Sequence, residues 1–130
     1  MGARSDIALA LAHRFAKVGN DIQLAARNSD GLIEDKLDIE LRYGVNVTLH
    51  EFDALDTTLN ELFINSLPMI PDVAVCVIGH MGEQKESERD VQIAALVMRS
   101  NYEGPAAILA ALANRFEERG SGTLVGISSV

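Results

Sequence analysis

The sequence predicts an α/β fold in which helices cover a parallel, doubly wound sheet. Segments with the apolar spacing of a helix alternate with short apolar runs typical of strands, and this helix–strand pair occurs four times. The run at residues 73–78 is apolar at every position, which is typical of a strand buried on both faces of a parallel sheet. Strands joined through helices in this order lie parallel, with right-handed crossovers.

The first helix–strand pair is expected at residues 5–18 and 22–26. Apolar residues recur every three or four positions in the first segment, and either Ser5 or Asp6 is suited to cap its start. Gly19 and Asn20 end the helix, and the apolar run that follows predicts a buried strand.

The second pair is expected at residues 32–42 and 45–52, and a third helix at 57–67. Gly44 separates the helix from the strand in the second pair, and the strand alternates apolar and polar residues. Pro68 and Pro71 then force a turn before the apolar strand at 73–78.

The last pair is a long helix from about 88 to 119, with a break expected at Gly104-Pro105, and a strand at 123–129. A doubly wound domain begins with an apolar strand that leads into a glycine turn, and here only Met1 precedes Gly2. We therefore expect residues 1–130 to form a partial domain, with the first strand and everything after the fifth strand missing.

Composition narrows the functional classes. Eleven basic residues against nineteen acidic ones give a net charge of −8 and a pI near 4.7, which argues against a nucleic-acid partner. No apolar stretch approaches the roughly 20 residues of a membrane span.

The single cysteine, Cys76, excludes a disulfide framework and suits a reducing cytoplasm. The three histidines and Cys76 lack metal-ligand spacing, so no metal site is expected.

In a parallel sheet of this kind, ligands bind at the carboxyl ends of the strands. Four clusters occupy those ends: residues 2–8, 27–28, 53–56 and 79–82. Together with Asn101 and Ser129, they resemble the short-chain dehydrogenase/reductase family of NAD(P)-dependent oxidoreductases over nearly the whole chain. The resemblance implies a Rossmann-like fold and a nicotinamide cofactor.

The glycine-rich turn of the family, T-G-x-x-x-G-x-G, resembles the stretch from Gly2 to Ala8. Asp6 and Ala8 stand at the second and third glycine positions, which departs from the family pattern. The helix that follows offers N–H groups to a pyrophosphate. By resemblance, the cofactor-binding residues in this turn are Gly2, Arg4, Ser5, Asp6 and Ile7.

Further cofactor contacts follow from the resemblance at the other strand ends. Arg27 and Asn28 stand where the family selects its cofactor, and a guanidinium there favours the 2′-phosphate of NADP over NAD; a solvated arginine is the alternative. Asp53 resembles the aspartate that binds the adenine amino group, with Ala54 against the ring, although an isolated aspartate is more often a turn-former. Ile78, Gly79 and Ile127 are expected to line the cofactor; Cys76 and Val77 replace asparagines of the family motif.

The resemblance also implies catalytic roles. Asn101 matches an asparagine that kinks the fourth helix and helps to hold a proton-relay water; its alternative role is an ordinary helix break. Ser129 matches the serine that hydrogen-bonds the substrate oxygen. The family's acid/base tyrosine and lysine are absent, because neither Tyr43 nor Tyr102 is followed four positions later by lysine. This chain alone is therefore expected to be inactive.

The whole protein is thus expected to transfer hydride between nicotinamide and a small carbonyl or alcohol substrate, and to be a homo-oligomer through its long helix. Residues 52–56, 101–102 and 116–120 further resemble bacterial decaprenylphosphoryl keto-ribose reductases. A non-catalytic nucleotide-binding or scaffold module remains the alternative.

Overall fold

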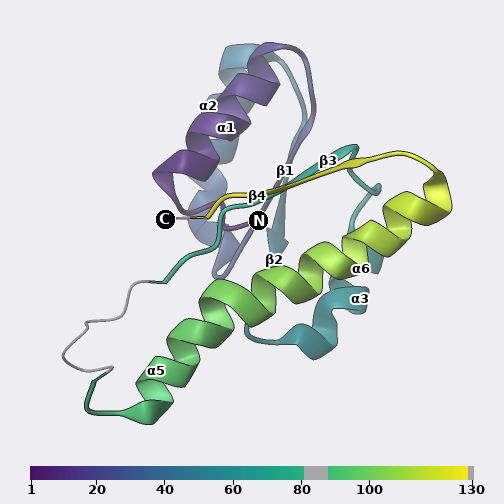
Figure 1. The fold of residues 1–130 in the computed structure, drawn as a ribbon. Coiled ribbons are helices and arrows are strands. Elements are labelled where there is room, and N and C mark those ends of the chain that lie inside the picture. Colours follow the sequence, from purple (N-terminus) through teal and green to yellow (C-terminus); the bar gives the residue numbers. More distant parts are fainter. Residues whose placement is uncertain (81–87, 129–130) are drawn as a thin grey trace.

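The computed structural model describes residues 1–80 and 88–128 (Figure 1). Its strands are β1 (Ile22–Ala26), β2 (Val47–Glu51), β3 (Val73–Cys76) and β4 (Thr123–Gly126). Its α-helices are α1 (Asp6–Lys17), α2 (Ile33–Tyr43), α3 (Asn60–Ser66), α5 (Val91–Met98) and α6 (Gly104–Arg119), with short 3-10 turns at Ser29–Leu32 and Thr57–Leu59. The predicted alternation of helices and strands is confirmed. β1 has the expected bounds, whereas the three later strands end earlier than expected, the last at residue 126 instead of 129.

The strands form two parallel pairs. Residues Ile22 to Ala26 of β1 face Val47 to Glu51 of β2, and Val73 to Cys76 of β3 face Thr123 to Gly126 of β4. This division confirms the prediction of an incomplete doubly wound sheet, in which the strand that belongs between β1 and β3 is missing.

The first residues of the chain lie between the two pairs. The Met1 amino group donates to the Val75 carbonyl at 2.7 Å, and the Val77 N–H donates to the Met1 carbonyl at 3.0 Å. On the other side, the Gly2 N–H donates to the Ala25 carbonyl at 2.9 Å. Residues 1–3 therefore give the spatial order β2, β1, amino end, β3, β4, which is the doubly wound order.

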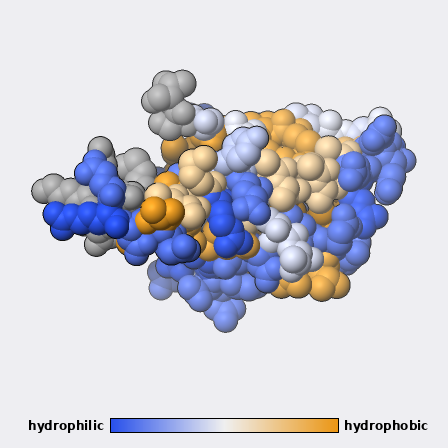
Figure 2. All heavy atoms as spheres, turned by 60° about the horizontal axis from the view of Figure 1, so that its bottom comes forward, coloured by the Kyte–Doolittle hydropathy of each residue, from blue (hydrophilic) through white to orange (hydrophobic). Residues whose placement is uncertain are grey.

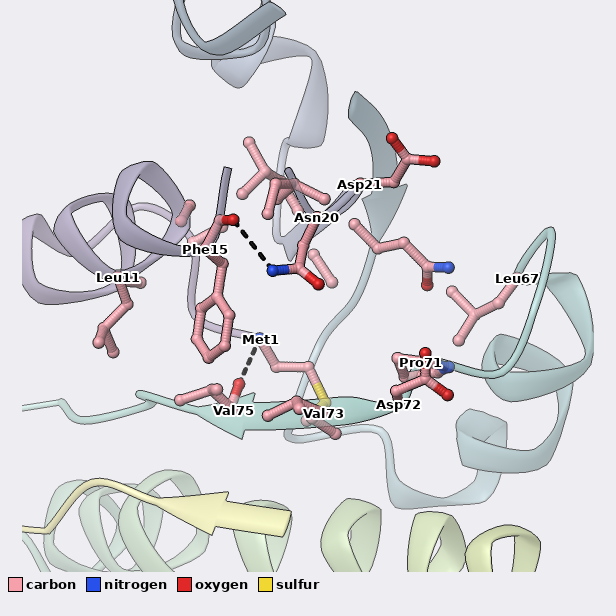
Figure 3. A pocket seen from close by; sticks show the side chains of 18 of the residues that line it. Met1, Leu11, Phe15, Asn20, Asp21, Leu67, Pro71, Asp72, Val73 and Val75 are labelled. Atoms are coloured by element: carbon pink, nitrogen blue, oxygen red, sulfur yellow. Dashed lines mark hydrogen bonds between the residues drawn. The ribbon is translucent and has the colours of Figure 1, made fainter. Parts of the chain in front are cut away.

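A cavity of about 390 Å³ lies where the missing strand would run (Figure 3). Met1, Phe15 and Val75 line it together with residues of β1. The expectation that residues 73–78 are buried on both faces is wrong for this chain: Val73 lines the cavity and is 38% exposed. At Val73 the strand pairs with β4 along one edge and borders the cavity along the other.

Two apolar cores lie on opposite faces of β1. Leu24 and Ala26 pack into a cluster with α1, α2 and β2, whereas Ala25 packs into a second cluster with α3 and α6. Alternate residues of a strand point to opposite faces, so β1 is covered on both sides, as Figure 1 shows. None of the helices within residues 1–80 and 88–128 is long and apolar enough to cross a membrane.

The long helix contains a π-helical turn. The break predicted at Gly104-Pro105 is wrong: a π turn at Arg99–Glu103 joins α5 to α6 and carries the chain through the proline, which lies in the first turn of α6. Proline lacks an N–H and crowds the preceding turn of an α-helix, and the wider π turn directly before it accommodates this. Gly104 is buried, and a Cβ atom on it would collide with the carbonyl oxygen of Ala54. The glycine therefore serves close packing.

Candidate cofactor cleft

A cleft of about 280 Å³ opens at the carboxyl ends of β1, β2 and β3. It gathers residues from all the strand-end clusters singled out in the sequence: Gly2, Arg4, Ser5, Arg27, Asp53, Ala54, Ile78 and Gly79, with Ala26, Phe52, Leu55, Val77, His80 and Ser100 beside them. The predicted residues Asp6, Ile7, Asn28 and Ile127 do not line it. This meeting of distant segments follows from the parallel topology, which brings the strand ends to one edge.

The turn at Gly2 packs tightly under the cleft. Gly2 has φ +81°, and a Cβ atom there would collide with the Val77 carbonyl oxygen, so only glycine fits without strain. Of the two candidate caps of α1, Ser5 is the one used: its Oγ accepts the Ala8 N–H at 3.1 Å. Asp6 is the first helical residue and is exposed.

The turn after β1 is anchored by Glu51, a residue that the sequence pattern does not single out. Asn28 has φ +52°, and the carboxylate of Glu51 accepts the N–H groups of Asn28 at 2.8 Å and Ser29 at 2.9 Å. The bonds from Ser29 and Asn28 lower the pKa of Glu51. Arg27 is exposed beside this turn, and within the described residues its side chain has no hydrogen-bond or ion-pair partner. What identifies Glu51 is the strand register, which sets it opposite Ala26 at the end of both strands.

Asp53 and Ala54 follow β2 at the cleft edge. The Asp53 carboxylate accepts the Leu55 N–H at 3.0 Å, which is the turn-forming role that the sequence left open. Asp53 is nevertheless exposed in the cleft, and its carboxylate is the only one among the cleft-lining side chains of the described residues. Ala54 abuts Gly104, which ties this edge to α6.

Asn101 lies in the π turn and clamps the loop after β3. Its side-chain amide donates to the His80 carbonyl at 2.9 Å, and its oxygen accepts the His80 N–H at 2.6 Å. Ile127 donates its N–H to the Cys76 carbonyl at 2.9 Å. Ser129, the predicted substrate contact, lies outside the described residues.

The charges of the cleft suit an anion. Arg4 and Arg27 bring two guanidinium groups to a protein whose net charge is −8, and the start of α1, with its partial positive charge, lies beside them. Within residues 1–80 and 88–128, no group of three or more His, Cys, Asp or Glu residues is placed to hold a metal ion.

Apolar side chains are also exposed away from the cleft. Figure 2 looks at the face below α5 and α6 in Figure 1 and shows apolar patches among charged side chains. Exposed apolar residues on this long helix include Val91, Met98 and Tyr102.

Comparisons with known proteins agree with this geometry. An uncharacterized oxidoreductase of Mycobacterium tuberculosis is 33% identical over 134 aligned positions, which cover 99% of this chain and 53% of the relative. A bulky-bulky ketone specific alcohol dehydrogenase from Comamonas testosteroni has the same fold, with a TM-score of 0.85 at 23% identity over 99% of this chain and 53% of that one. A short-chain dehydrogenase from Sphingobium yanoikuyae, solved in complex with NADPH, gives a TM-score of 0.81 at 25% identity, over 99% of this chain and 51% of that one.

No family model matches the chain. The chain spans about half the length of the curated relatives that it matches.

Proposed function

We propose that this chain is the cofactor-binding part of an NAD(P)-dependent oxidoreductase of the short-chain dehydrogenase/reductase type, a family with solved structures that share its fold over nearly its whole length. The observation that carries the proposal is the cleft, where four sequence-distant segments meet at the carboxyl ends of three parallel strands. Ligands of open α/β sheets bind at this edge.

The residues of the cleft fit a dinucleotide. The start of α1 suits a pyrophosphate, since the first N–H groups of a helix and the helix dipole favour negative charge there, and Gly2 lines the same cleft without a side chain. Asp53 and Ala54 suit an adenine ring, and Ile78 and Gly79 line the continuation of the cleft. When bound, a nicotinamide cofactor supplies the donor or acceptor of hydride.

Arg27 favours NADP over NAD. An acidic side chain at the end of β1 would accept hydrogen bonds from a free ribose hydroxyl, and here Arg27 follows that strand instead. A guanidinium pairs with phosphate through two parallel N–H bonds. Arg4 lines the same cleft and adds a second positive charge.

We infer a small carbonyl or alcohol substrate, with Ser129 as hydrogen-bond partner of its oxygen. Asn101 holds the loop after β3 in place through His80. These 130 residues contain no tyrosine that is followed by lysine four positions later, so the acid/base pair of the family has no counterpart among them. The 130-residue chain by itself is then inactive.

The exposed apolar residues of the long helix, among them Met98 and Tyr102, suit a contact between copies of the protein, so we propose a homo-oligomer. The free, buried thiol of Cys76 suits a reducing compartment, and we propose the cytoplasm.

Replacing Arg27 tests the cofactor assignment. In the full-length natural protein, Arg27→Ala is expected to weaken NADPH binding by roughly 10- to 100-fold, because a hydrogen-bonded charge contributes about 1.5–3 kcal/mol. NADH binding is expected to change little, since NADH lacks the phosphate. Isothermal titration calorimetry with both cofactors measures the two effects.

Arg14→Ala is the matched control, because Arg14 is also an exposed arginine but lies in the last turn of α1 and does not line the cleft. It is expected to leave both affinities unchanged. Absence of binding of either cofactor by the unaltered protein would refute the proposed function. Equal losses of NADPH and NADH affinity in Arg27→Ala would refute the NADP assignment alone.

A further inference from the structure

Glu51 ties the end of β2 to the turn that follows β1. Its two carboxylate oxygens accept one N–H each, from Asn28 at 2.8 Å and from Ser29 at 2.9 Å. The bonds fix Asn28 in a left-handed conformation, which asparagine adopts more readily than most residues other than glycine. The residue directly before this turn is Arg27, which lines the cleft.

The same carboxylate decides which groups of the turn remain for a ligand. Consecutive backbone N–H groups in such a turn form a concave site that attracts anions. Here Glu51 already occupies both N–H groups. An anionic ligand at this strand end is therefore left with the guanidinium of Arg27, which has no partner among the described residues.

We propose that Glu51 is a positioning residue for cofactor selection: it fixes the turn so that Arg27 is held where the 2′-phosphate of NADP binds. The inference rests on the proposed function. NAD and NADP differ only in that phosphate, so a loose turn weakens the binding of NADP while the contacts shared with NAD persist. Glu51 acts through Arg27 and the backbone and has no contact with the ligand of its own.

The opposite end of the same two strands supplies a matched control. Asp21, which precedes β1, accepts the N–H of Asn46, which precedes β2, at 2.8 Å. Asp21 and Glu51 are both exposed carboxylates that join the loops of the β1–β2 pair. Asp21 does not line the cleft. Removing either carboxylate therefore costs a similar structural tie, but only Glu51 borders the Arg27 turn.

The test compares Glu51→Ala and Asp21→Ala in the full-length natural protein. The dissociation constants of NADP⁺ and NAD⁺ are measured by calorimetry. Glu51→Ala is expected to lower the preference for NADP⁺ on the order of tenfold, equivalent to about 1.4 kcal/mol, with little change for NAD⁺. Asp21→Ala is expected to keep the preference.

Chemical rescue supplies a second readout. Formate is a small carboxylate that fits the two vacated N–H groups, so adding it to Glu51→Ala is expected to restore part of the NADP⁺ preference, with chloride at equal ionic strength as the control. A formate ion that merely competed for Arg27 would lower NADP⁺ binding instead, and this result would contradict the inference.

The remaining outcomes separate this inference from the function on which it rests. If the unaltered protein prefers NADP⁺ and Glu51→Ala keeps the preference, or loses affinity for both cofactors equally, the role of Glu51 is wrong and the proposed function stands. The role of Glu51 is equally wrong if Asp21→Ala lowers the preference as much as Glu51→Ala. If the unaltered protein binds both cofactors equally, the role of Glu51 and the NADP assignment are wrong, whereas NAD(P) binding stands. If it binds neither cofactor, the proposed function is wrong as well.

Discussion

Joining five alternating valine and isoleucine residues to the amino end of Met1 is expected to raise the free energy of unfolding of the chain by about 4 kcal/mol. Burying one such side chain contributes about 1.5–3 kcal/mol, and ordering each residue costs about 1–2 kcal/mol. The added strand would enter the cavity of about 390 Å³ between β1 and β3. Urea unfolding, followed by circular dichroism, measures the difference.

The backbone of Met1 already lies in the position from which an added strand would continue. Its backbone already pairs with Val75 and Val77 of the β3 segment, so a preceding residue continues a parallel strand between two existing neighbours. Burial lowers the pKa of the Met1 amino group, because a charge is disfavoured away from water. An extension replaces this amino group by a neutral amide.

A proline in the middle of the same extension is the control for added apolar mass. Proline lacks the N–H that a central strand needs, so this version is expected to gain much less stability. Equal gains for the two versions would mean that the added residues adhere to the surface without forming a strand. No gain for either would contradict the assignment of the cavity to a missing strand.

Ile108→Ala is expected to cost about 2–5 kcal/mol of unfolding free energy, the range for truncating a fully buried isoleucine. Ile108 lies on α6 and is 0% exposed, in the core cluster that also contains Phe52 and Ile64. Domains of this kind are stable by about 5–15 kcal/mol in total, so this one change removes a large share. Urea unfolding monitored by circular dichroism checks it.

Leu62→Ala serves as the comparison for Ile108→Ala. Leu62 is an aliphatic residue on neighbouring α3 but is 67% exposed. Its truncation is expected to change stability by no more than about 0.5 kcal/mol. Similar costs for the two variants would show that Ile108 does not lie in the core described above.

The fold is largely predictable because its signals are local. The spacing in α1 and the apolar runs of β1 and β3 are each contained in one segment, and alternation of such segments implies parallel strands. The predictions that are wrong concern features that depend on residues far away in the sequence. Val73 is partly exposed because an adjacent strand is missing, and the Gly104-Pro105 pair stays helical because the π turn and the contact with Ala54 accommodate it.

In the candidate site, too, some residues could be predicted from the local sequence and others could not. Residues directly after a strand, such as Arg27 and Asp53, meet in the cleft because parallel strands end at one edge. The glycine-turn motif predicts Asp6 and Ile7 as cofactor contacts. Both residues begin α1 and do not line the cleft, so these contacts stay predictions. Glu51 could not be found without the register that sets it opposite Ala26, since nothing in its own segment distinguishes it.

The π turn at Arg99–Glu103 joins two helices that differ in how many of their side chains are buried in the core. On α6, Ile108, Leu112 and Phe116 are buried, whereas α5 has no buried residue. Without buried side chains, α5 is held by its continuation into the π turn and α6 alone. The backbone amides of α5 are therefore expected to exchange with solvent deuterium through fraying of the helix end, and those of α6 only when the core opens. One continuous ribbon would then contain a fast and a slow region of exchange, divided by the π turn.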